Sequence, residues 1–439
     1  MTGAASDQPA LRFFGPLAGL DASQRRALLD RTTSGDDDVR RATAEIVADV
    51  RRRGDVALRE LAARFDGVTL EEFEVPVARW DAALDGLDAG LRNAMERAAR
   101  NIATVQRAFL PSIAEVVPEP GILVGRRPDP LACVGVYAPG GRATYPSSVL
   151  MGAVPARVAG VGQVVLCSPP GPGGLPMPVV LAAARIAQVD RVFALGGAGA
   201  VAAMAFGTET VPGVDRIVGP GNAFVAEAKL QVSGVVGIDS PAGPSELLVI
   251  ADAHASPDVV ARELVAQAEH DPRACVVAVV EGEAFAARLR EALGLLVPLA
   301  RRREVIAQAL AGQGAILWTN TIQDAVRWAN AYAPEHLLVC AGQPDHVLSG
   351  IRNAGTVFLG ESASVSFGDY MTGANHVLPT GGLARSYSGL SVLDFFRWTT
   401  YQSVTPDAAA RLAVDVDVFA QAEGLYGHAA AARAWVRER

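Results

Sequence analysis

The sequence predicts an α/β protein with two domains, each built on a parallel sheet. Short apolar runs alternate with Gly- and Pro-rich loops and Ala-rich helices from residue 131 onward, and a second series of this kind begins near Glu246. Alternation of strand, loop and helix is typical of a parallel sheet with helices on its faces. The length of 439 residues and the hydrophobic content of 50% fit roughly two to three domains with large cores.

The N-terminal part of the chain, residues 22–110, is helical by pattern, being rich in Ala, Leu and charged residues. One helix is expected from Asp36 to Arg53, and a second helical stretch over residues 80–109. Strands are expected in the first series at 133–137, 164–167, 191–195 and 216–218, and in the second at 247–251, 275–280, 315–318, 337–340 and 356–359. A loop-rich segment covers 360–389, and an Ala-rich helical tail begins near Val416.

Charge and cysteine content exclude several classes of protein. The net charge is −8 and no run of Lys or Arg stands out, so neither a nucleic-acid nor a membrane partner has electrostatic support. The longest uncharged stretch, 158–184, is interrupted by Pro and Gly and is not a membrane helix. The four cysteines are scattered, which predicts reduced thiols in a cytoplasmic protein.

Histidine is the most informative residue type, since four of the six histidines stand in polar clusters. Imidazole titrates near neutrality and is the commonest metal ligand. Each clustered histidine has a carboxylate or an amide close in sequence, which suggests one assembled site. The clusters are Gln267 with His270, Glu335 with His336, Asp369 with Asn375 and His376, and Glu423 with His428.

The first cluster ends a helix expected at 257–270. Ser256 is expected to cap the start of that helix with its hydroxyl, and Pro272 ends it because Pro moves the preceding residue out of the α region. Gln267 and His270 are three residues apart and so lie on one face of the last turn, where they could hold one metal ion. The alternative is a histidine that interacts only with the helix C-terminus.

The second and third clusters lie in loops or at junctions. Glu335 and His336 stand between an expected helix at 322–332 and a strand, where a carboxylate beside an imidazole is a workable acid–base couple. A capping Glu and an exposed His are the alternative. Asp369 and His376 fall in the Gly-rich loop, either as ligands or substrate contacts or as parts of a turn.

Two further patterns are weak by themselves. Glu423 and His428 are five residues apart, about 140° on a helix, so they would not share a face. Gly197, Gly199 and Ala202 follow the strand 191–195 in the Gly-x-Gly-x-x-Ala form of a dinucleotide-binding turn. A tight turn with close helix packing explains these glycines equally well.

In combination, the motifs are far more specific. Taken together they resemble the histidinol dehydrogenase family over nearly the whole chain. In chain order they are Gly135-Val-Tyr-Ala-Pro-Gly-Gly-Arg-Ala-Thr-Tyr-Pro-Ser-Ser-Val-Leu-Met151, Ile217-Val-Gly-Pro-Gly-Asn222, Ile238-Asp-Ser-Pro-Ala-Gly-Pro-Ser-Glu246, Gln267-Ala-Glu-His270, Ala333-Pro-Glu-His336 and Asn375-His-Val-Leu-Pro-Thr380.

The resemblance implies zinc-dependent oxidation of L-histidinol through histidinal to L-histidine, with two hydrides passed in turn to NAD. It implies Glu335 and His336 as the proton-transfer pair. It implies one zinc ion per subunit, bound by Gln267, His270, Asp369 and His428. The implied substrate contacts are these four ligands and His336, together with Ser245, His376 and Glu423. The implied NAD-side residues are Tyr137, Asn222 and the position of Gly199.

The resemblance also implies an architecture. Two Rossmann-like domains, one inserted in the other, would form an intertwined homodimer in which each tail completes the partner's site. The expected parts are an N-terminal segment 1–30, a first α/β domain from 31–136 and 245–389 with the zinc and catalytic residues, an inserted NAD-side domain 137–244, and a helical dimerisation tail 390–439.

Three positions depart from the family pattern. Gly199 stands where a glutamine is usual, Gly152 where an asparagine is usual, and Phe396-Arg397-Trp398 where a pair of basic residues is common. They motivate an alternative, a related zinc-dependent dehydrogenase for another alcohol or amino alcohol. A zinc hydrolase with Glu335 as base is a poorer alternative, because the chain has no His-Glu-x-x-His helix. A non-catalytic metal-binding or scaffold protein is the poorest.

Overall fold

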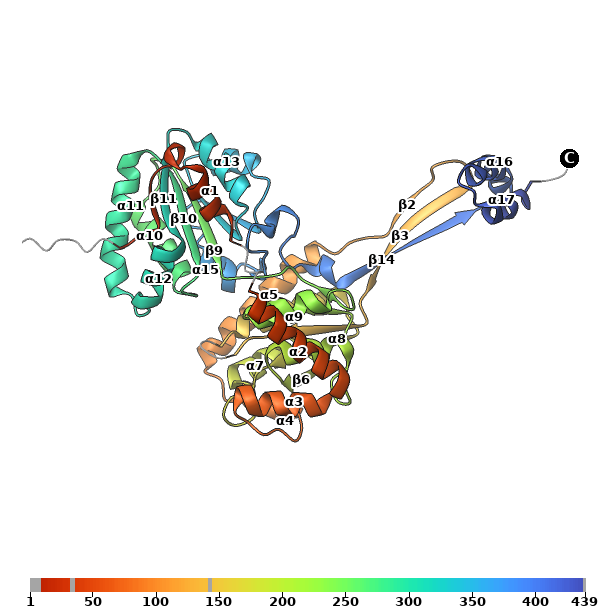
Figure 1. The fold of residues 1–439 in the computed structure, drawn as a ribbon, viewed down its shortest axis with the longest axis horizontal. Coiled ribbons are helices and arrows are strands. Elements are labelled where there is room, and N and C mark those ends of the chain that lie inside the picture. The colour runs from red at the N-terminus through yellow and green to blue at the C-terminus, as the bar shows by residue number, and fades with distance from the viewer. Residues whose placement is uncertain (1–8, 32–35, 141–143, 437–439) are drawn as a thin grey trace, which may run out of the picture.

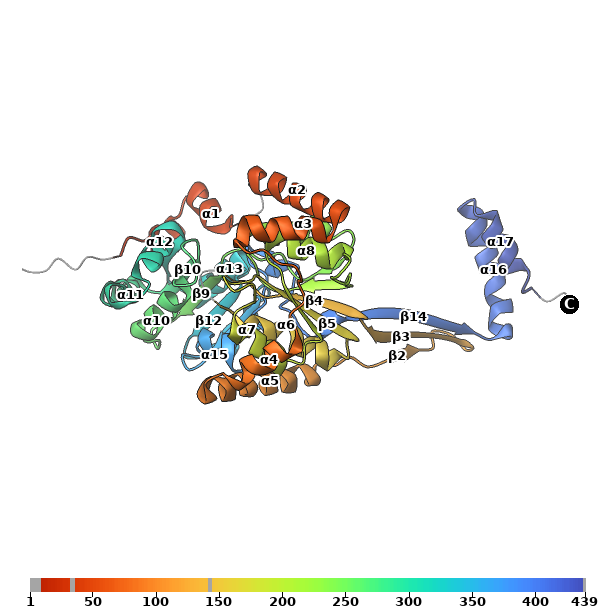
Figure 2. The ribbon, with the colours of Figure 1, turned by 90° about the horizontal axis from the view of Figure 1, so that it is seen from below.

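The computed structural model describes residues 9–31, 36–140 and 144–436, so Gly141, Arg142 and Ala143 of the first motif lie outside it. A six-stranded and a five-stranded parallel sheet form the body, and a long arm carries the C-terminal helices away from it (Figures 1 and 2). None of the described helices is long and apolar enough to cross a membrane.

The six-stranded sheet has the order β1-β11-β10-β9-β12-β13, with all neighbours parallel. Alternate residues of β9 face opposite sides: Leu247 and Val249 pack under α10, α11 and α12, whereas Leu248 and Ile250 pack with α1 and α13. Its strands are β1 (Phe13–Pro16), β9 (Glu246–Ala251), β10 (Cys275–Glu281), β11 (Gly314–Thr319), β12 (His336–Cys340) and β13 (Thr356–Leu359). Its helices are α1 (Ala22–Leu29), α10 (Pro257–Ala268), α11 (Glu283–Leu296), α12 (Arg303–Gln313), α13 (Ile322–Tyr332), α14 (Pro344–Gly350) and α15 (Val365–Tyr370).

The five-stranded sheet has the order β6-β5-β4-β7-β8, again parallel throughout. Its strands are β4 (Cys133–Tyr137), β5 (Gln163–Ser168), β6 (Arg191–Ala194), β7 (Arg216–Val218) and β8 (Gly237–Ile238). The connecting helices are α6 (Pro146–Ala159), α7 (Pro178–Ile186), α8 (Gly197–Phe206) and α9 (Ala223–Val232). An outer layer adds α2 (Asp37–Arg53), α3 (Asp55–Leu61), α4 (Val77–Asp85) and α5 (Ala89–Ala108).

The domain bounds differ from those expected. The expected domain of the catalytic residues includes 31–136, but α2 and α3 pack on α8 and α9, and α4 and α5 pack on α7 and α6. Their apolar residues share one core with the five-stranded sheet. The expected N-terminal segment is instead part of the six-stranded sheet, since Phe13 pairs in register with Ala315.

Several local expectations also differ. The helical stretch expected at 80–109 is two helices, interrupted at Gly86. Ser256 precedes α10 without capping it through its side chain; its amide donates to the Glu361 carboxylate instead. Asp369, expected in a loop, lies in the last turn of α15. Short 3-10 turns occupy Leu17–Gly19, Val297–Leu299, Leu383–Arg385 and Val392–Phe395, and a π-helical turn occupies Ala62–Asp66.

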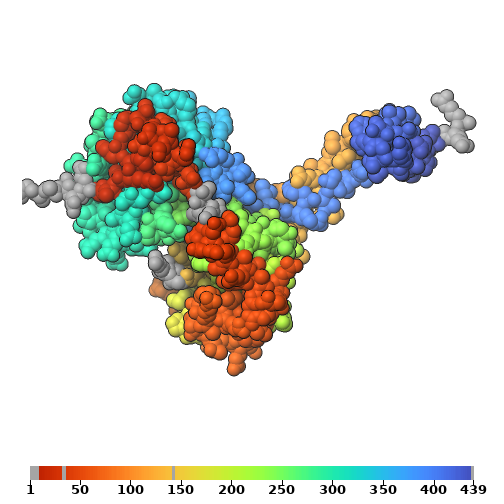
Figure 3. Space-filling view, viewed as in Figure 1, coloured from red at the N-terminus to blue at the C-terminus, as the bar shows by residue number. Residues whose placement is uncertain are grey.

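The tail is not helical from its start. Its strand β14 (Phe396–Val404) pairs antiparallel with β3 (Ile122–Pro130), and β2 (Ala114–Val116) pairs with β3, to form the arm. Helices α16 (Pro406–Ala422) and α17 (Tyr426–Arg433) form a lobe at its tip that projects from the body (Figure 3). Many apolar side chains of this lobe are exposed: Val414, Val416, Val418, Phe419, Leu425, Tyr426, Trp435 and Val436.

Candidate active site

Glu335 and His336 are buried at the amino end of β12, next to β9. Their exposed fractions are 5% and 4%. The chain reaches them through a tight turn: α13 ends at Tyr332, and Ala333 adopts the left-handed conformation with φ of 50°. A non-glycine residue in that conformation is strained. The expected junction of helix and strand is therefore present, but its two residues are enclosed by the sheet rather than exposed.

The main chain of Glu246, the first residue of β9, binds both side chains. Its amide donates a 2.6 Å hydrogen bond to Oε2 of Glu335. Its carbonyl oxygen lies 3.0 Å from Nδ1 of His336 and accepts from it, so that Nδ1 carries the proton. The other ring nitrogen, Nε2, is buried and makes no hydrogen bond to any described residue.

Opposite charges surround the imidazole of His336. Nδ1 lies 3.5 Å from Oε2 of Glu335, and Nε2 lies 3.6 Å from Oδ1 of Asp369. Burial alone would lower the pKa of His336, but the Glu335 and Asp369 carboxylates outweigh burial and raise that pKa well above its usual value. Burial raises the pKa of Glu335, and the imidazole opposes that shift.

Two further histidines, His376 and His270, lie near Asp369. His376 directs Nδ1 at the Asp369 carbonyl oxygen, 2.9 Å away. Burial would raise the pKa of the Asp369 carboxyl, yet the neighbouring His336, His376 and His270 bring it below its usual value. Burial lowers the pKa of His376, which favours the neutral imidazole. Three of the four histidine clusters identified in the sequence therefore meet around one carboxylate.

Gln267 is buried on the face of α10 that lies toward α15. Glu263, one turn earlier on that face, accepts a 3.1 Å hydrogen bond from the amide of Val365 at the start of α15. Gln267 is 3% exposed, and its main-chain carbonyl oxygen accepts a 3.3 Å hydrogen bond from the amide of His270. Ser245 precedes β9 at the same edge of the sheet, next to Glu246.

Glu423 and His428 do not join this cluster within one chain. Both are exposed in the lobe at the tip of the arm, far from β12 (Figure 2). Gly424, with φ of 74°, ends α16 between them. No group of three or more His, Cys, Asp or Glu residues able to hold a metal is found among the described residues. Of the four expected zinc ligands, a single chain brings only Gln267, His270 and Asp369 to this side of the body, which amounts to one amide, one imidazole and one carboxylate.

The residues expected on the NAD side lie at the carboxyl edge of the five-stranded sheet, where α/β proteins bind ligands. Tyr137 ends β4, and its hydroxyl accepts a 3.1 Å hydrogen bond from the amide of Gly197. Burial raises the pKa of Tyr137 to about 12. Asn222 caps α9, where its Oδ1 accepts from the amides of Phe224 and Val225 at 3.0 and 3.1 Å.

Known proteins are similar to this chain in sequence and in fold. A family model described as histidinol dehydrogenase matches residues 29–436. The chain belongs to the histidinol dehydrogenase family. The histidinol dehydrogenase of Methanothermobacter thermautotrophicus is 46% identical over 94% of this chain and 96% of its own. That of Burkholderia pseudomallei is 46% identical over 94% of each chain. The crystal structure of histidinol dehydrogenase from Elizabethkingia anophelis superposes with a TM-score of 0.92 at 32% identity and covers 98% of both chains.

Membership in the histidinol dehydrogenase family makes this chain a dehydrogenase, and its departures from the family pattern have structural explanations. A Cβ on Gly199 would lie 3.0 Å from Cδ1 of Leu61, so this face of α8 packs on α3. A Cβ on Gly152 would lie 2.8 Å from Cγ1 of Val136, so α6 lies close against β4. The segment 396–398 belongs to β14 in the arm, where Arg126 stacks 4.2 Å from the ring centre of Trp398.

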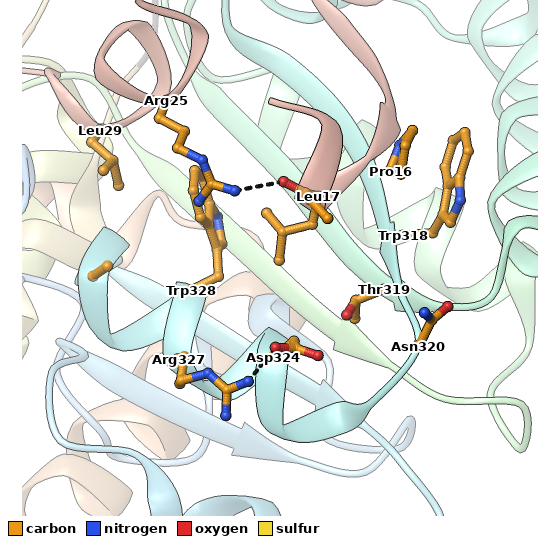
Figure 4. Close-up of a pocket in the computed structure, with 12 residues that line it drawn as sticks. Pro16, Leu17, Arg25, Leu29, Trp318, Thr319, Asn320, Asp324, Arg327 and Trp328 are labelled. Atoms are coloured by element: carbon orange, nitrogen blue, oxygen red, sulfur yellow. Dashed lines mark hydrogen bonds and ion pairs between the residues drawn. The ribbon is translucent and has the colours of Figure 1, made fainter. Parts of the chain in front are cut away.

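One cavity of this histidinol dehydrogenase homologue lies away from all of these residues. It measures about 400 Å³ at the carboxyl ends of β1 and β11, and α13 forms one wall (Figure 4). Arg25 stands over the ring of Trp328, and Arg327 pairs with Asp324. None of the predicted site residues lines it.

Sequence reasoning missed two residues of the site. Glu246 is the last residue of the motif Ile238–Glu246, in which only Ser245 is a predicted substrate contact. Arg31, just after α1, forms a buried ion pair with Glu246, with Nε 2.9 Å from Oε1. A buried arginine has no periodic signature, and its partner lies in a strand more than two hundred residues away in sequence. Only the fold brings them together.

Proposed function

We propose that this protein oxidises L-histidinol through L-histidinal to L-histidine, with zinc and with two molecules of NAD in turn. One observation carries the proposal: His336 stands between the carboxylates of Glu335 and Asp369, with Nε2 free of hydrogen bonds to described residues. That arrangement provides a base at the metal-binding edge of the site, as alcohol oxidation requires.

His336 is the proposed base of the first oxidation. Its Nδ1 hydrogen bond to Glu246 fixes the orientation of the ring, and in the neutral ring Nε2 carries the lone pair that would accept the proton of the substrate hydroxyl. The carboxylates that raise the pKa of the imidazole also strengthen it as a proton acceptor. Nε2 takes the alcohol proton while the carbon-bound hydrogen leaves as hydride to NAD, and the aldehyde forms.

Glu335 is the proposed base of the second oxidation. Burial raises the pKa of its carboxyl, so the carboxylate accepts a proton more readily than an exposed one. It removes a proton from water that attacks the aldehyde carbon, and a hydrate results. The hydrate then loses a second hydride to a second NAD, and the product is the carboxylate.

A zinc ion fits the donors of one chain. Gln267, His270 and Asp369 would provide oxygen and nitrogen ligands, and the hydrogen bond from Val365 to Glu263 links the helices that carry Gln267 and Asp369. Bound there, zinc would position the substrate through its amine and imidazole. His376, Ser245 and, from a second copy, Glu423 are the proposed further substrate contacts.

NAD is proposed to bind at the carboxyl edge of the five-stranded sheet, beside Tyr137 and Asn222. These residues bind the turns that follow β6 and β7. A Cβ at position 199 would point toward Leu61, so Gly199 is proposed to serve only the first turn of α8 and not to contact NAD through a side chain.

A homodimer with exchanged tails would complete the site. Gln267, His270 and Asp369 would leave one zinc position for His428 of a second copy. In each chain His428 lies in the lobe at the tip of the arm, and this lobe exposes many apolar side chains. Such exposure marks a protein-binding surface. We also place the enzyme in the cytoplasm, which is supported by its four free cysteines.

The three departures from the family pattern motivated the alternative of a dehydrogenase for another alcohol, and the structure gives them a different place. Gly152 and Gly199 pack inside the domain and Trp398 lies in the arm, so none of the three departures favours a different alcohol. The decisive assay supplies histidinol and NAD to zinc-loaded enzyme, with a panel of other amino alcohols in parallel. We expect two NADH per histidinol. No NADH from histidinol, despite bound zinc, would overturn the proposal.

A further inference from the structure

The structure assigns a role to a buried ion pair outside the proposed catalytic residues: we propose that Arg31 and Glu246 position Glu335 and His336 for proton transfer. This inference rests on the proposed function, because it concerns the same site. Neither residue is expected to touch the substrate, so both act through the groups that they hold.

Every polar group of Glu246 is engaged at the site. Its amide binds the Glu335 carboxylate and its carbonyl oxygen binds the His336 ring. Its side chain accepts a 2.8 Å hydrogen bond from the amide of Gly381, and Oε2 lies 3.4 Å from the amide of Glu335. A shift of Glu246 would therefore move both proton-transfer groups together.

Arg31 makes two hydrogen bonds to the carboxylate of Glu246. Nε lies 2.9 Å from Oε1 and Nη2 lies 3.1 Å from Oε2, and both side chains are 2% exposed. The fork matches the planar carboxylate and fixes its orientation. Lysine, with a single charged point, would not reproduce that geometry.

The same guanidinium also binds the turn that leads to Glu335. Nη2 donates a 2.8 Å hydrogen bond to the carbonyl oxygen of Tyr332, and the guanidinium lies 3.5 Å from the centre of the Tyr332 ring. The next residue is Ala333, in the strained left-handed conformation. Arg31 thus joins the start of β9, whose Glu246 main chain binds both proton-transfer groups, to the end of α13, which leads to them.

Stability alone is a poor explanation of the pair. Desolvation of two charges offsets most of their attraction, so a buried ion pair adds little net stability compared with apolar side chains. The paired hydrogen bonds instead fix the position of Glu246 relative to Arg31. A displacement of about 1 Å in a catalytic group is enough to lower turnover roughly 100-fold.

The test compares Arg31→Met, Glu246→Gln and the double variant with wild type. We measure kcat, KM for histidinol and for NAD, zinc content and the unfolding midpoint. The single variants are expected to lose kcat about 100-fold with little change in either KM. The double variant removes both charges, so its unfolding midpoint should recover while kcat stays low. Recovery of kcat together with the midpoint, or single variants with wild-type kcat, would overturn the inference.

Two further variants make the result unambiguous. Asp55→Asn is the matched control, because Asp55, the first residue of α3 in the other domain, is 4% exposed and accepts a hydrogen bond from the hydroxyl of Thr210. It should lower the unfolding midpoint and leave kcat unchanged; an equal loss of kcat there would overturn the positioning role. If Arg31→Met fails to fold, Arg31→Lys replaces it and should lose kcat while keeping its zinc and both KM values; wild-type kcat in this variant would count against the fork.

Failure of the proposed function has a different signature. If wild type forms no NADH from histidinol, amide hydrogen exchange at Glu246 decides the inference. Its amide is protected by the Glu335 carboxylate. Exchange should accelerate in the double variant and stay slow in Asp55→Asn. Unchanged exchange in the double variant would overturn the positioning role.

Discussion

Nε2 of His336 lies 3.6 Å from Oδ1 of Asp369, and it is a buried ring nitrogen without a hydrogen bond to any described residue. The distance is too long for a direct bond and short enough for a strong charge interaction. His336→Gln keeps a polar side chain there but removes the base. We expect kcat to fall roughly 10²- to 10⁴-fold with zinc content unchanged, as measured by NADH formation and metal analysis. A variant that turns over normally would remove His336 from the mechanism.

Glu335→Gln should separate the two oxidations. The amide retains much of the shape of the carboxylate but does not accept the proton of water, so the aldehyde is not hydrated efficiently. A single turnover from histidinol should then approach one NADH instead of two. The measurement is the ratio of NADH to substrate with enzyme in excess. A ratio that stays at two would show that another group activates the water.

His270→Ala should weaken metal binding. The imidazole is one of the proposed donors beside Asp369, so its loss should lower zinc content after dialysis and leave activity dependent on added zinc. His254→Ala is the control, since His254 is exposed in a turn before α10. Equal zinc retention in both variants, measured by metal analysis, would contradict a ligand role for His270.

The exchanged tail predicts complementation between inactive variants. His336→Gln and His428→Ala should each be inactive as homodimers, because one lacks the base and the other the donor from the tail. After mixing and subunit exchange, a heterodimer contains one site with a normal body and a normal tail. Random pairing should restore about a quarter of wild-type activity. No recovery, with exchange verified by mass spectrometry, would show that the tail does not serve the partner.

Gly199→Gln should destabilise the protein instead of improving NAD binding. A Cβ at this position meets Leu61 at 3.0 Å, and extra atoms in a packed interface cost about 1–3 kcal/mol. The unfolding midpoint should fall, and KM for NAD should not decrease. Leu61→Ala in the same chain should relieve part of the loss. A lower KM for NAD at unchanged stability would restore the cofactor role of this side chain.

The central strands of both sheets could be predicted because each is a short apolar run between turns. β1 and β14 could not, since half of β1 is Gly15 and Pro16 and β14 is largely polar and exposed. The packing of α2 to α5 was misassigned for a different reason. An amphipathic helix shows that it has a buried face, but its sequence does not say which sheet lies beneath.

The candidate site shows the same limit. Gln267 and His270 share a helix end and could be paired from their spacing. His376 and Asp369 could be suspected, but that His336 faces Asp369 depends on how α15 lies against β12, which no local pattern specifies. Arg31 and Glu246 were missed because the value of a buried ion pair depends on contacts far apart in sequence.

The place of β1 at the edge of the six-stranded sheet has a consequence for synthesis. The strand pairs with β11, and nearby Arg12 binds the carbonyl of Gly312, 300 residues away in sequence. During translation every strand of the five-stranded sheet leaves the ribosome before β11 exists. The nascent chain can therefore complete that sheet while the first strand of the other remains unpaired, and the exposed apolar edge would be a target for chaperones until the last third of the message is translated.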